Sequence, residues 1–203
     1  MAPIIVHNTY IYIRELPSEI DSLLPQCSAE IIEQLNSISS PRRKREIIAR
    51  HLIIKDIWED GVNITHDENG APLLCGVDGY ISISHSATEI AVAYNPLHNI
   101  GIDIENWREQ IIKVKSRFLS PQELNIYTTP QLMLKAWTLK EAIYKVAQSP
   151  GISLADDIIL PLAPNETIAK VNTRNGVRDI QTHEIISTPS RCVTLAFPLL
   201  KTT

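Results

Sequence analysis

Glycine is scarce in this sequence, with only 7 among 203 residues, so we do not expect a glycine-rich phosphate-binding loop. The three cysteines are odd in number and widely spaced, which excludes the usual zinc and redox motifs and is typical of reduced, buried thiols. No apolar run approaches the ~20 residues that a membrane span needs. The amino terminus lacks the basic and apolar regions of a signal peptide. We therefore expect a cytoplasmic protein with no membrane partner.

An excess of basic residues is also missing. The chain has 19 Lys and Arg against 23 Asp and Glu, which gives a formal net charge of −4. Proteins that coat nucleic acid are usually strongly basic, so we expect no nucleic-acid partner. The apolar share of 44% and the charged share of 21% are ordinary for a folded protein, which excludes a disordered chain. The length fits one large domain or two small halves.

Alternating apolar patterns and turn residues predict an α+β protein. The expected strands lie near residues 4–13, 62–66, 72–75, 80–85, 90–94, 100–105, 156–160, 167–172, 177–186 and 191–197. The expected helical segments lie near residues 29–38, 41–58, 108–118, from 120 onward, and 130–147. Asn175-Gly176 predicts a type I′ hairpin turn. Strands and helices follow in a similar order in residues 1–98 and 99–203. We expect a pseudo-dimer of two similar halves with a ligand cleft between them.

Two carboxylates share one face of the strand expected over residues 100–105. Asp103 and Glu105 are two residues apart, so both side chains point away from the isoleucines of that strand. Like charges about 7 Å apart repel mildly unless a cation lies between them. Mg²⁺ prefers oxygen ligands and often shares them with substrate phosphates. A solvated strand face is the simpler explanation of this pair taken alone.

The long helix expected over residues 130–147 has a polar arc opposite its apolar arc. The members of the polar arc are Trp137, Lys140, Glu141, Tyr144 and Lys145. Glu141 and Lys145 are four residues apart, and an ordinary helical ion pair explains them when they are taken alone. A large indole suits a solvated face poorly. The arc therefore predicts the wall of a cleft.

Two segments could bind an anion. His85 lies near the end of its strand, where it could reach a phosphate, although a half-buried histidine beside a turn is the simpler explanation. The cations of Arg42–Arg45 occupy the first turn of a helix, where they oppose the helix dipole. A bound anion would offset that cost, and a solvated basic patch is the alternative. Arg50 extends the positive side.

Ser120 and Glu123 have the spacing of a capping box, which explains both residues structurally and leaves a role of Glu123 at a metal as the alternative. On the strand expected over residues 80–85, Ser82 and Ser84 share one face with Ser86, opposite Ile81, Ile83 and His85. These serines lack the Gly-x-Ser-x-Gly pattern, so a serine hydrolase is disfavoured.

Taken together, these segments resemble the 4′-phosphopantetheinyl transferase superfamily. The resemblance is closer to its larger monomeric type, which activates peptide and polyketide synthetases, than to its short trimeric type. The matching stretches are Ile83-Ser84-His85-Ser86, Gly101-Ile102-Asp103-Ile104-Glu105, Trp137-Thr138-Leu139-Lys140-Glu141-Ala142-Ile143-Tyr144-Lys145 and Arg45-Glu46-Ile47-Ile48-Ala49-Arg50.

The resemblance implies a pseudo-dimeric α+β fold with coenzyme A bound between the halves. It also implies a Mg²⁺-dependent transfer of 4′-phosphopantetheine from coenzyme A to a serine of an apo acyl, peptidyl or aryl carrier protein, which releases adenosine 3′,5′-bisphosphate. The implied Mg²⁺ ligands are Asp103, Glu105 and Glu141. The implied contacts to coenzyme A are Ser84, His85, Lys140, Lys145, Arg45 and Arg50.

Some roles stay open within this resemblance. The base for the carrier serine is Glu141, Glu123 or a metal-bound water. Trp137 would shape the cleft. The family often has Gly-Lys-Pro before the histidine strand, with its lysine near the nucleotide, whereas this chain has Gly70-Ala71-Pro72. Coenzyme A would then depend more on the basic cluster or bind more weakly.

Carrier proteins are commonly acidic, so a chain with a net charge of −4 needs a local basic surface to bind one. Lys113, Lys115 and Arg117 are the candidates. Two other functions stay open. One is a Mg²⁺-dependent nuclease or other phosphoryl-transfer enzyme, which the net charge disfavours. The other is an inactive module that binds coenzyme A or a carrier, which the intact acidic set disfavours.

Overall fold

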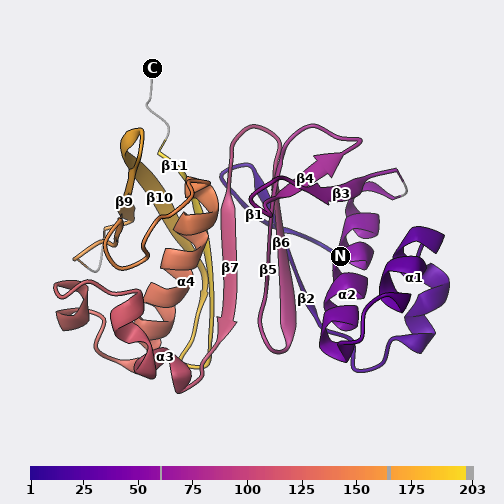
Figure 1. The fold of residues 1–203 in the computed structure, drawn as a ribbon, viewed down its shortest axis with the longest axis horizontal. Coiled ribbons are helices and arrows are strands. Elements are labelled where there is room, and N and C mark those ends of the chain that lie inside the picture. The colour runs from indigo at the N-terminus through magenta and orange to yellow at the C-terminus, as the bar shows by residue number, and fades with distance from the viewer. Residues whose placement is uncertain (60, 164–165, 200–203) are drawn as a thin grey trace.

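Two β-sheets lie between two long helices in the computed structural model, which describes residues 1–59, 61–163 and 166–199 (Figure 1). The first sheet has the strand order β1-β2-β6-β5, and the second has the order β7-β11-β10-β9-β8. The strands of the first sheet are β1 (Ile4–Val6), β2 (Thr9–Glu15), β5 (Tyr80–His85) and β6 (Glu89–Asn95). Those of the second are β7 (Gly101–Asn106), β8 (Ile158–Ile159), β9 (Ile168–Thr173), β10 (Gly176–Ser187) and β11 (Arg191–Pro198).

The remaining elements cover or connect these sheets. A separate two-stranded sheet joins β3 (Asn63–His66) and β4 (Pro72–Cys75). The α-helices are α1 (Ala29–Asn36), α2 (Pro41–Trp58), α3 (Gln110–Lys113) and α4 (Pro130–Ala147). Short 3₁₀ helices span Asp21–Gln26, Lys115–Arg117 and Glu123–Asn125. The mixed α+β class predicted from the sequence is confirmed. No helix in the described ranges is long and apolar enough to cross a membrane.

Both long helices begin where their sequence signals predict. Ser40 caps α2 by accepting a hydrogen bond from the Arg43 amide, and Pro41 follows at the first helical position. Thr129 caps α4 in the same way through the Leu132 amide, again with a proline next. A side-chain oxygen before the helix satisfies an amide that has no partner within the helix. Proline costs nothing there because its missing N–H would be unpaired anyway.

Three local predictions were wrong. The strand expected over residues 4–13 is a hairpin, because His7 and Asn8 take positive φ angles of 47° and 59° and reverse the chain. The Asn175-Gly176 hairpin forms, but its turn is not type I′, since only Gly176 has a positive φ, of 110°. The helix expected over residues 108–118 is one short α-helix followed by a 3₁₀ turn.

Because side chains alternate along the strands, apolar residues pack between the two sheets and also between each sheet and its helix. Ile11, Ala91 and Ala93 of the first sheet pack against isoleucines and other apolar residues of β7 and β11, which joins the two sheets face to face. The opposite face of the first sheet packs against Ala49 and Ile53 of α2. The opposite face of the second sheet packs against α4. The order of layers is helix, sheet, sheet, helix. The pseudo-dimer and the division at residues 98 and 99 stay predictions.

Gly101 sets the distance between β7 and α4. A Cβ atom at this position would lie 2.0 Å from the carbonyl oxygen of Ala142, which no side chain tolerates unless the helix moves. Glycine in a strand often marks such a close approach of backbones. Asp103 projects from the same face of β7 as Gly101, so α4 lies directly over this carboxylate.

Candidate active site

The candidate site lies at the seam where edge strand β5 of the first sheet meets edge strand β7 of the second. Ser82 Oγ accepts a hydrogen bond of 3.0 Å from the Ile102 amide. Ser84 Oγ donates one of 2.6 Å to Asp103 Oδ1. The predicted alternation of β5, with its serines on one face, is therefore confirmed, and the serine face fastens one sheet to the other. Ser84 is 8% exposed, and its hydroxyl is bonded to Asp103 rather than turned to a cleft.

Asp103 and Lys145 form the centre of this site. Lys145 Nζ on α4 lies 3.0 Å from Asp103 Oδ1 and donates a second hydrogen bond of 2.7 Å to the carbonyl oxygen of Ile102. Asp103 is 6% exposed, whereas the Lys145 side chain is 27% exposed. The aspartate is thus held from two sides, and its lysine partner still reaches solvent.

Glu141 and Glu105 belong to the same neighbourhood. The pKa of Glu141 is raised to about 6, mainly by burial and also by the charges of Asp103 and Glu105, against the opposing effect of Lys145. Burial also raises the pKa of Glu105, although Arg108 Nη2 lies 2.9 Å from its Oε2. The three carboxylates, two on β7 and one on α4, are therefore close enough to repel one another.

This donor set fits a hard divalent cation in its chemistry, since such ions prefer carboxylate oxygens. Repulsion among the three acids, which adds to the effect of burial in raising the pKa of Glu141, would be relieved by a cation. As they stand, however, no three His, Cys, Asp or Glu side chains of residues 1–59, 61–163 and 166–199 are gathered into a metal site. Lys145 and Arg108 are paired with two of the acids, so a bound cation would compete with them.

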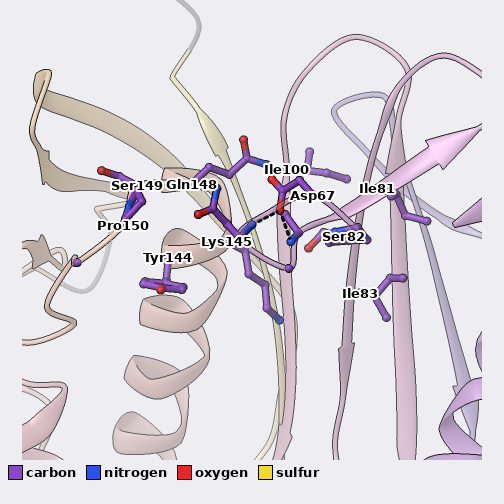
Figure 2. A pocket seen from close by; sticks show the side chains of 15 residues that line it. Asp67, Ile81, Ser82, Ile83, Ile100, Tyr144, Lys145, Gln148, Ser149 and Pro150 are labelled. Atoms are coloured by element: carbon purple, nitrogen blue, oxygen red, sulfur yellow. Dashed lines mark hydrogen bonds between the residues drawn. The ribbon is translucent and has the colours of Figure 1, made fainter. Parts of the chain in front are cut away.

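A cleft of about 440 Å³ opens beside Lys145 (Figure 2). Lys145, Tyr144 and Gln148 line it from the end of α4, and residues 81–83 of β5 face them across it. The loop at residues 67–72 closes one end. Its Asp67 side chain accepts hydrogen bonds of 2.9 Å and 2.8 Å from the amides of Asn69 and Ala71, which fixes the loop. The sequence predicted a cleft wall on α4, and Tyr144 and Lys145 form one.

A smaller pocket of about 170 Å³ adjoins the cleft and shares Gly70, Pro72 and Ile83 with it. Arg43, Arg50 and His85 also line this pocket. Burial lowers the pKa of Arg50, and the charge of Arg43 lowers it further. Burial is likewise the main cause of the lowered pKa of His85. Arg43 and Arg50 offer guanidinium donors to an anion in this pocket, and Glu46, which also lines it, offsets part of their charge.

Glu46 is a buried acid that the sequence analysis missed. It is 5% exposed and accepts hydrogen bonds of 3.0 Å from Arg42 Nε and 3.1 Å from Arg43 Nη1. Its Oε1 also lies 3.4 Å from His85 Nδ1. The basic first turn of α2 is therefore partly neutralised. The spacing of Glu46, four residues after Arg42 and three after Arg43, was the signal for this pairing.

Lys140 and Glu123 lie outside the cleft, so the sequence-based placement of Lys140 on the open polar arc was wrong. The two form an ion pair with side chains 0% and 1% exposed, with Nζ–O distances of 2.9 Å and 2.8 Å. Lys140 also donates to the carbonyl oxygen of Ile158. Glu123 additionally accepts from the amides of Ser120 and Leu160, at 2.8 Å and 2.7 Å. The predicted capping box is confirmed, and the pair connects three segments of the C-terminal half.

Arg45 and Trp137 also lie away from the cleft. Arg45 lines a separate cavity of about 330 Å³ together with Lys44 and residues 18–21. Trp137 packs edge-on against Phe118, with ring centroids 5.1 Å apart, and is partly buried against the core of the C-terminal half. Of the two arginines predicted for one anion, only Arg50 lies beside His85.

A comparison with protein families gives a match that covers this site. The family model described as the 4′-phosphopantetheinyl transferase superfamily matches residues 99–195. This range contains Asp103, Glu105, Glu141 and Lys145. The chain therefore carries a domain of a transferase superfamily that acts on phosphopantetheine. That match confirms the sequence-based resemblance to this superfamily for residues 99–195. No curated protein matches the chain.

Proposed function

We propose that this protein transfers 4′-phosphopantetheine from coenzyme A to a serine of an apo acyl, peptidyl or aryl carrier protein. One observation carries the proposal: within the matched domain, Lys145 contacts Asp103 and at the same time lines a cleft of about 440 Å³. In this reaction the serine oxygen bonds to the β-phosphorus of coenzyme A. The bond from that phosphorus to the bridging oxygen breaks, and adenosine 3′,5′-bisphosphate leaves with the electron pair.

Coenzyme A would occupy the cleft and the adjoining pocket. Arg43 and Arg50 would bind its 3′-phosphate, since a guanidinium offers two parallel donors to phosphate oxygens. His85 lies in the same pocket, and its lowered pKa keeps it neutral near pH 7, where it can still donate one N–H. Ala71 lines the cleft where the family often has lysine, so the two arginines would carry more of the nucleotide's charge.

Lys145 would bind the pyrophosphate. Its ammonium lies beside the cleft and is partly exposed, so a small side-chain movement away from Asp103 brings it to a ligand. Negative charge develops on the leaving phosphate, and a cation placed there before the reaction stabilises the transition state more than the ground state. Ser84 would keep Asp103 oriented while Lys145 moves.

The proposed Mg²⁺ ligands are Asp103, Glu105 and Glu141. When bound, the ion would neutralise charge on the pyrophosphate. Within this chain, Lys145 and Arg108 would release the two acids of β7 that they now hold. Glu141 is the better candidate for the proton acceptor, because Glu123 is enclosed with Lys140 and has no route to a carrier serine.

The carrier would bind near α3, where exposed basic residues surround an apolar side chain. Ile112 is 40% exposed, and Lys113 and Arg117 are exposed beside it. Such a surface suits an acidic partner with an apolar contact of its own. We further propose that the protein is the larger monomeric type of the superfamily and acts in the cytoplasm.

The test is incubation of the protein with coenzyme A, Mg²⁺ and several apo carrier proteins, followed by mass spectrometry of each carrier. We expect the mass of one phosphopantetheine to be added to a serine, and we expect Asp103→Ala to abolish the addition. Asp179→Ala, which changes an exposed aspartate elsewhere in the second sheet, should keep full activity.

Two results would replace the proposal. Binding of coenzyme A without transfer to any carrier would show an inactive binding module. Cleavage of DNA that depends on Mg²⁺ and on Asp103, with no carrier modified, would show a nuclease.

A further inference from the structure

Thr194 on β11 carries a buried hydroxyl that has no explanation in the fold. The residue is 0% exposed, and within the described part of the chain its Oγ1 has no hydrogen-bond partner. Buried polar groups are nearly always paired, because an unpaired one has lost its hydrogen bonds to water and gained none. A valine has nearly the same shape and would avoid this loss. We therefore expect the hydroxyl to form a hydrogen bond in another state of the protein.

The strand pairing places this hydroxyl beside the candidate site. Thr194 is the direct partner of Asp103 in the antiparallel pair of β11 and β7. Side chains directly opposite each other in such a pair share one face of the sheet, with Cβ atoms about 5 Å apart. This is the face that lies under α4, next to Lys145. A short donor and a carboxylate are thus neighbours.

Asp103 has acceptor capacity to spare. Both hydrogen bonds found to its carboxylate in the described residues, from Ser84 and Lys145, go to Oδ1. A carboxylate accepts about four hydrogen bonds, two at each oxygen. On its other side Thr194 is paired with Glu184. Glu184 pairs with Lys135 at the surface, where water can also donate to it. Asp103 is buried, so a hydrogen bond from Thr194 stabilises Asp103 more than it would stabilise Glu184.

We propose that Thr194 is a positioning residue for Asp103: its hydroxyl holds this carboxylate once Lys145 has left it for the ligand in the cleft. The inference rests on the proposed function, because it assigns the loaded state to that reaction. In the free protein, Ser84 and Lys145 both hold Asp103 Oδ1, and the Thr194 hydroxyl is unpaired within the described residues. In the loaded protein, Lys145 binds the phosphates. The Thr194 hydroxyl then takes its place beside Ser84 and keeps Asp103 from turning toward its neighbouring acids.

The test measures binding rather than turnover. The affinity for Mn²⁺, as a probe of the carboxylate site, is measured by electron paramagnetic resonance in the presence of coenzyme A. We expect Thr194→Val to weaken Mn²⁺ binding about tenfold or more, the usual effect of losing a hydrogen-bond partner of a metal ligand. Thr194→Ser, which keeps the hydroxyl, should bind within about twofold of the parent, since its donor is retained.

Thermal stability separates this role from a merely structural one. Thr194→Val should be at least as stable as the parent, since it removes an unpaired polar group. Thr182→Val is the matched control. Its hydroxyl is also buried, but it donates to the carbonyl oxygen of Thr167 at 2.8 Å, far along β10. That variant should lose stability and keep Mn²⁺ affinity.

The outcomes are distinguishable. If the parent binds Mn²⁺ and Thr194→Val binds it equally well, the positioning role is overturned and the proposed function stands. If the parent itself does not bind Mn²⁺, the metal assignment within the proposed function fails, and the role of Thr194 fails with it.

Discussion

Lys145 Nζ and Asp103 Oδ1 lie 3.0 Å apart, so an ammonium already neutralises the aspartate that would hold a ligand cation. The two functions expected of this pair compete in the free protein. A lysine that neutralises Asp103 makes the folded protein tolerate a buried acid, and the same contact opposes the binding of a metal ion.

The competition predicts opposite effects of Lys145→Met on binding and on turnover. Mn²⁺ should bind more tightly, by about tenfold, because the loss of a neighbouring unit charge is worth about 1.4 kcal/mol or more at short range. Transfer of phosphopantetheine should fall by at least a hundredfold, since a cation at the developing charge is lost. Isothermal titration and the carrier mass assay measure the two effects.

Lys135→Met is the control for this experiment. It removes a lysine of the same helix that pairs with Glu184 at the surface. Neither Mn²⁺ affinity nor transfer should change by more than about twofold, as expected of an exposed pair. Weaker Mn²⁺ binding by Lys145→Met would contradict the competition.

The buried pair of Lys140 and Glu123 predicts a stability effect without a catalytic one. Lys140→Met should lower the free energy of unfolding by about 3–5 kcal/mol, because it leaves a buried carboxylate without its cation. Adding Glu123→Gln removes that charge and keeps an oxygen for the amides of Ser120 and Leu160, so the double variant should recover most of the loss. Urea denaturation gives both values.

Coenzyme A binding by that double variant decides whether Lys140 contacts the phosphates. We expect the folded double variant to bind coenzyme A as the parent does, since neither side chain lines the cleft. A stable double variant that had lost coenzyme A binding would instead show that Lys140 reaches the phosphates.

The raised pKa of Glu141 predicts a pH-dependent stability of the metal-free protein. This pKa is about 6 in the folded protein against an ordinary 4.5. The folded state therefore binds more protons than the unfolded state between these values, and stability falls as pH rises through this window. Above pH 6 the full loss, about 2 kcal/mol, remains. Glu141→Gln lacks this loss.

The measurement is the difference in unfolding free energy between the parent and Glu141→Gln, at pH 4.5 and pH 7.5 with a chelator present. The unfolding free energy of the variant should increase relative to that of the parent as pH rises. Equal differences at both pH values would show that neither burial nor the charges of Asp103 and Glu105 raise the pKa of Glu141.

The basic surface at α3 predicts a selective effect on the carrier. Changing Lys113, Lys115 and Arg117 together to glutamate should raise KM for an acidic carrier about tenfold or more, weaken its dependence on salt, and leave KM for coenzyme A unchanged. Lys170→Glu/Arg174→Glu, which reverses the exposed charges of Lys170 on β9 and of Arg174 directly after it, should leave both constants as they are. An unchanged carrier KM in the triple variant would place the docking surface elsewhere.

Periodicity predicted the parts of the site that lie on single elements. The two-residue period of β5 and β7 predicted which faces bear Ser84, Asp103 and Glu105, and the capping signals predicted where α2 and α4 begin. Both patterns depend only on local geometry, which neighbouring elements rarely change.

Other features depend on what a third element covers. Lys140 lies on the polar arc of α4, but Glu123 and β8 cover that side and bury it. Arg45 and Arg50 are five residues apart in α2, so they point to different cavities. Thr194 has no sequence signal at all, because only the register of β11 against β7 brings it to Asp103.

The seam between β5 and β7 makes folding and ligand binding interdependent. If the chain were cut after His98 and the two pieces were produced separately, Ser84 would belong to one piece and Asp103 to the other. Each piece would also expose the apolar face that now joins the sheets, and would aggregate unless the other were present. Co-expression of the pieces would then yield a soluble, noncovalent complex, and recovery of the site would report that the two sheets had docked.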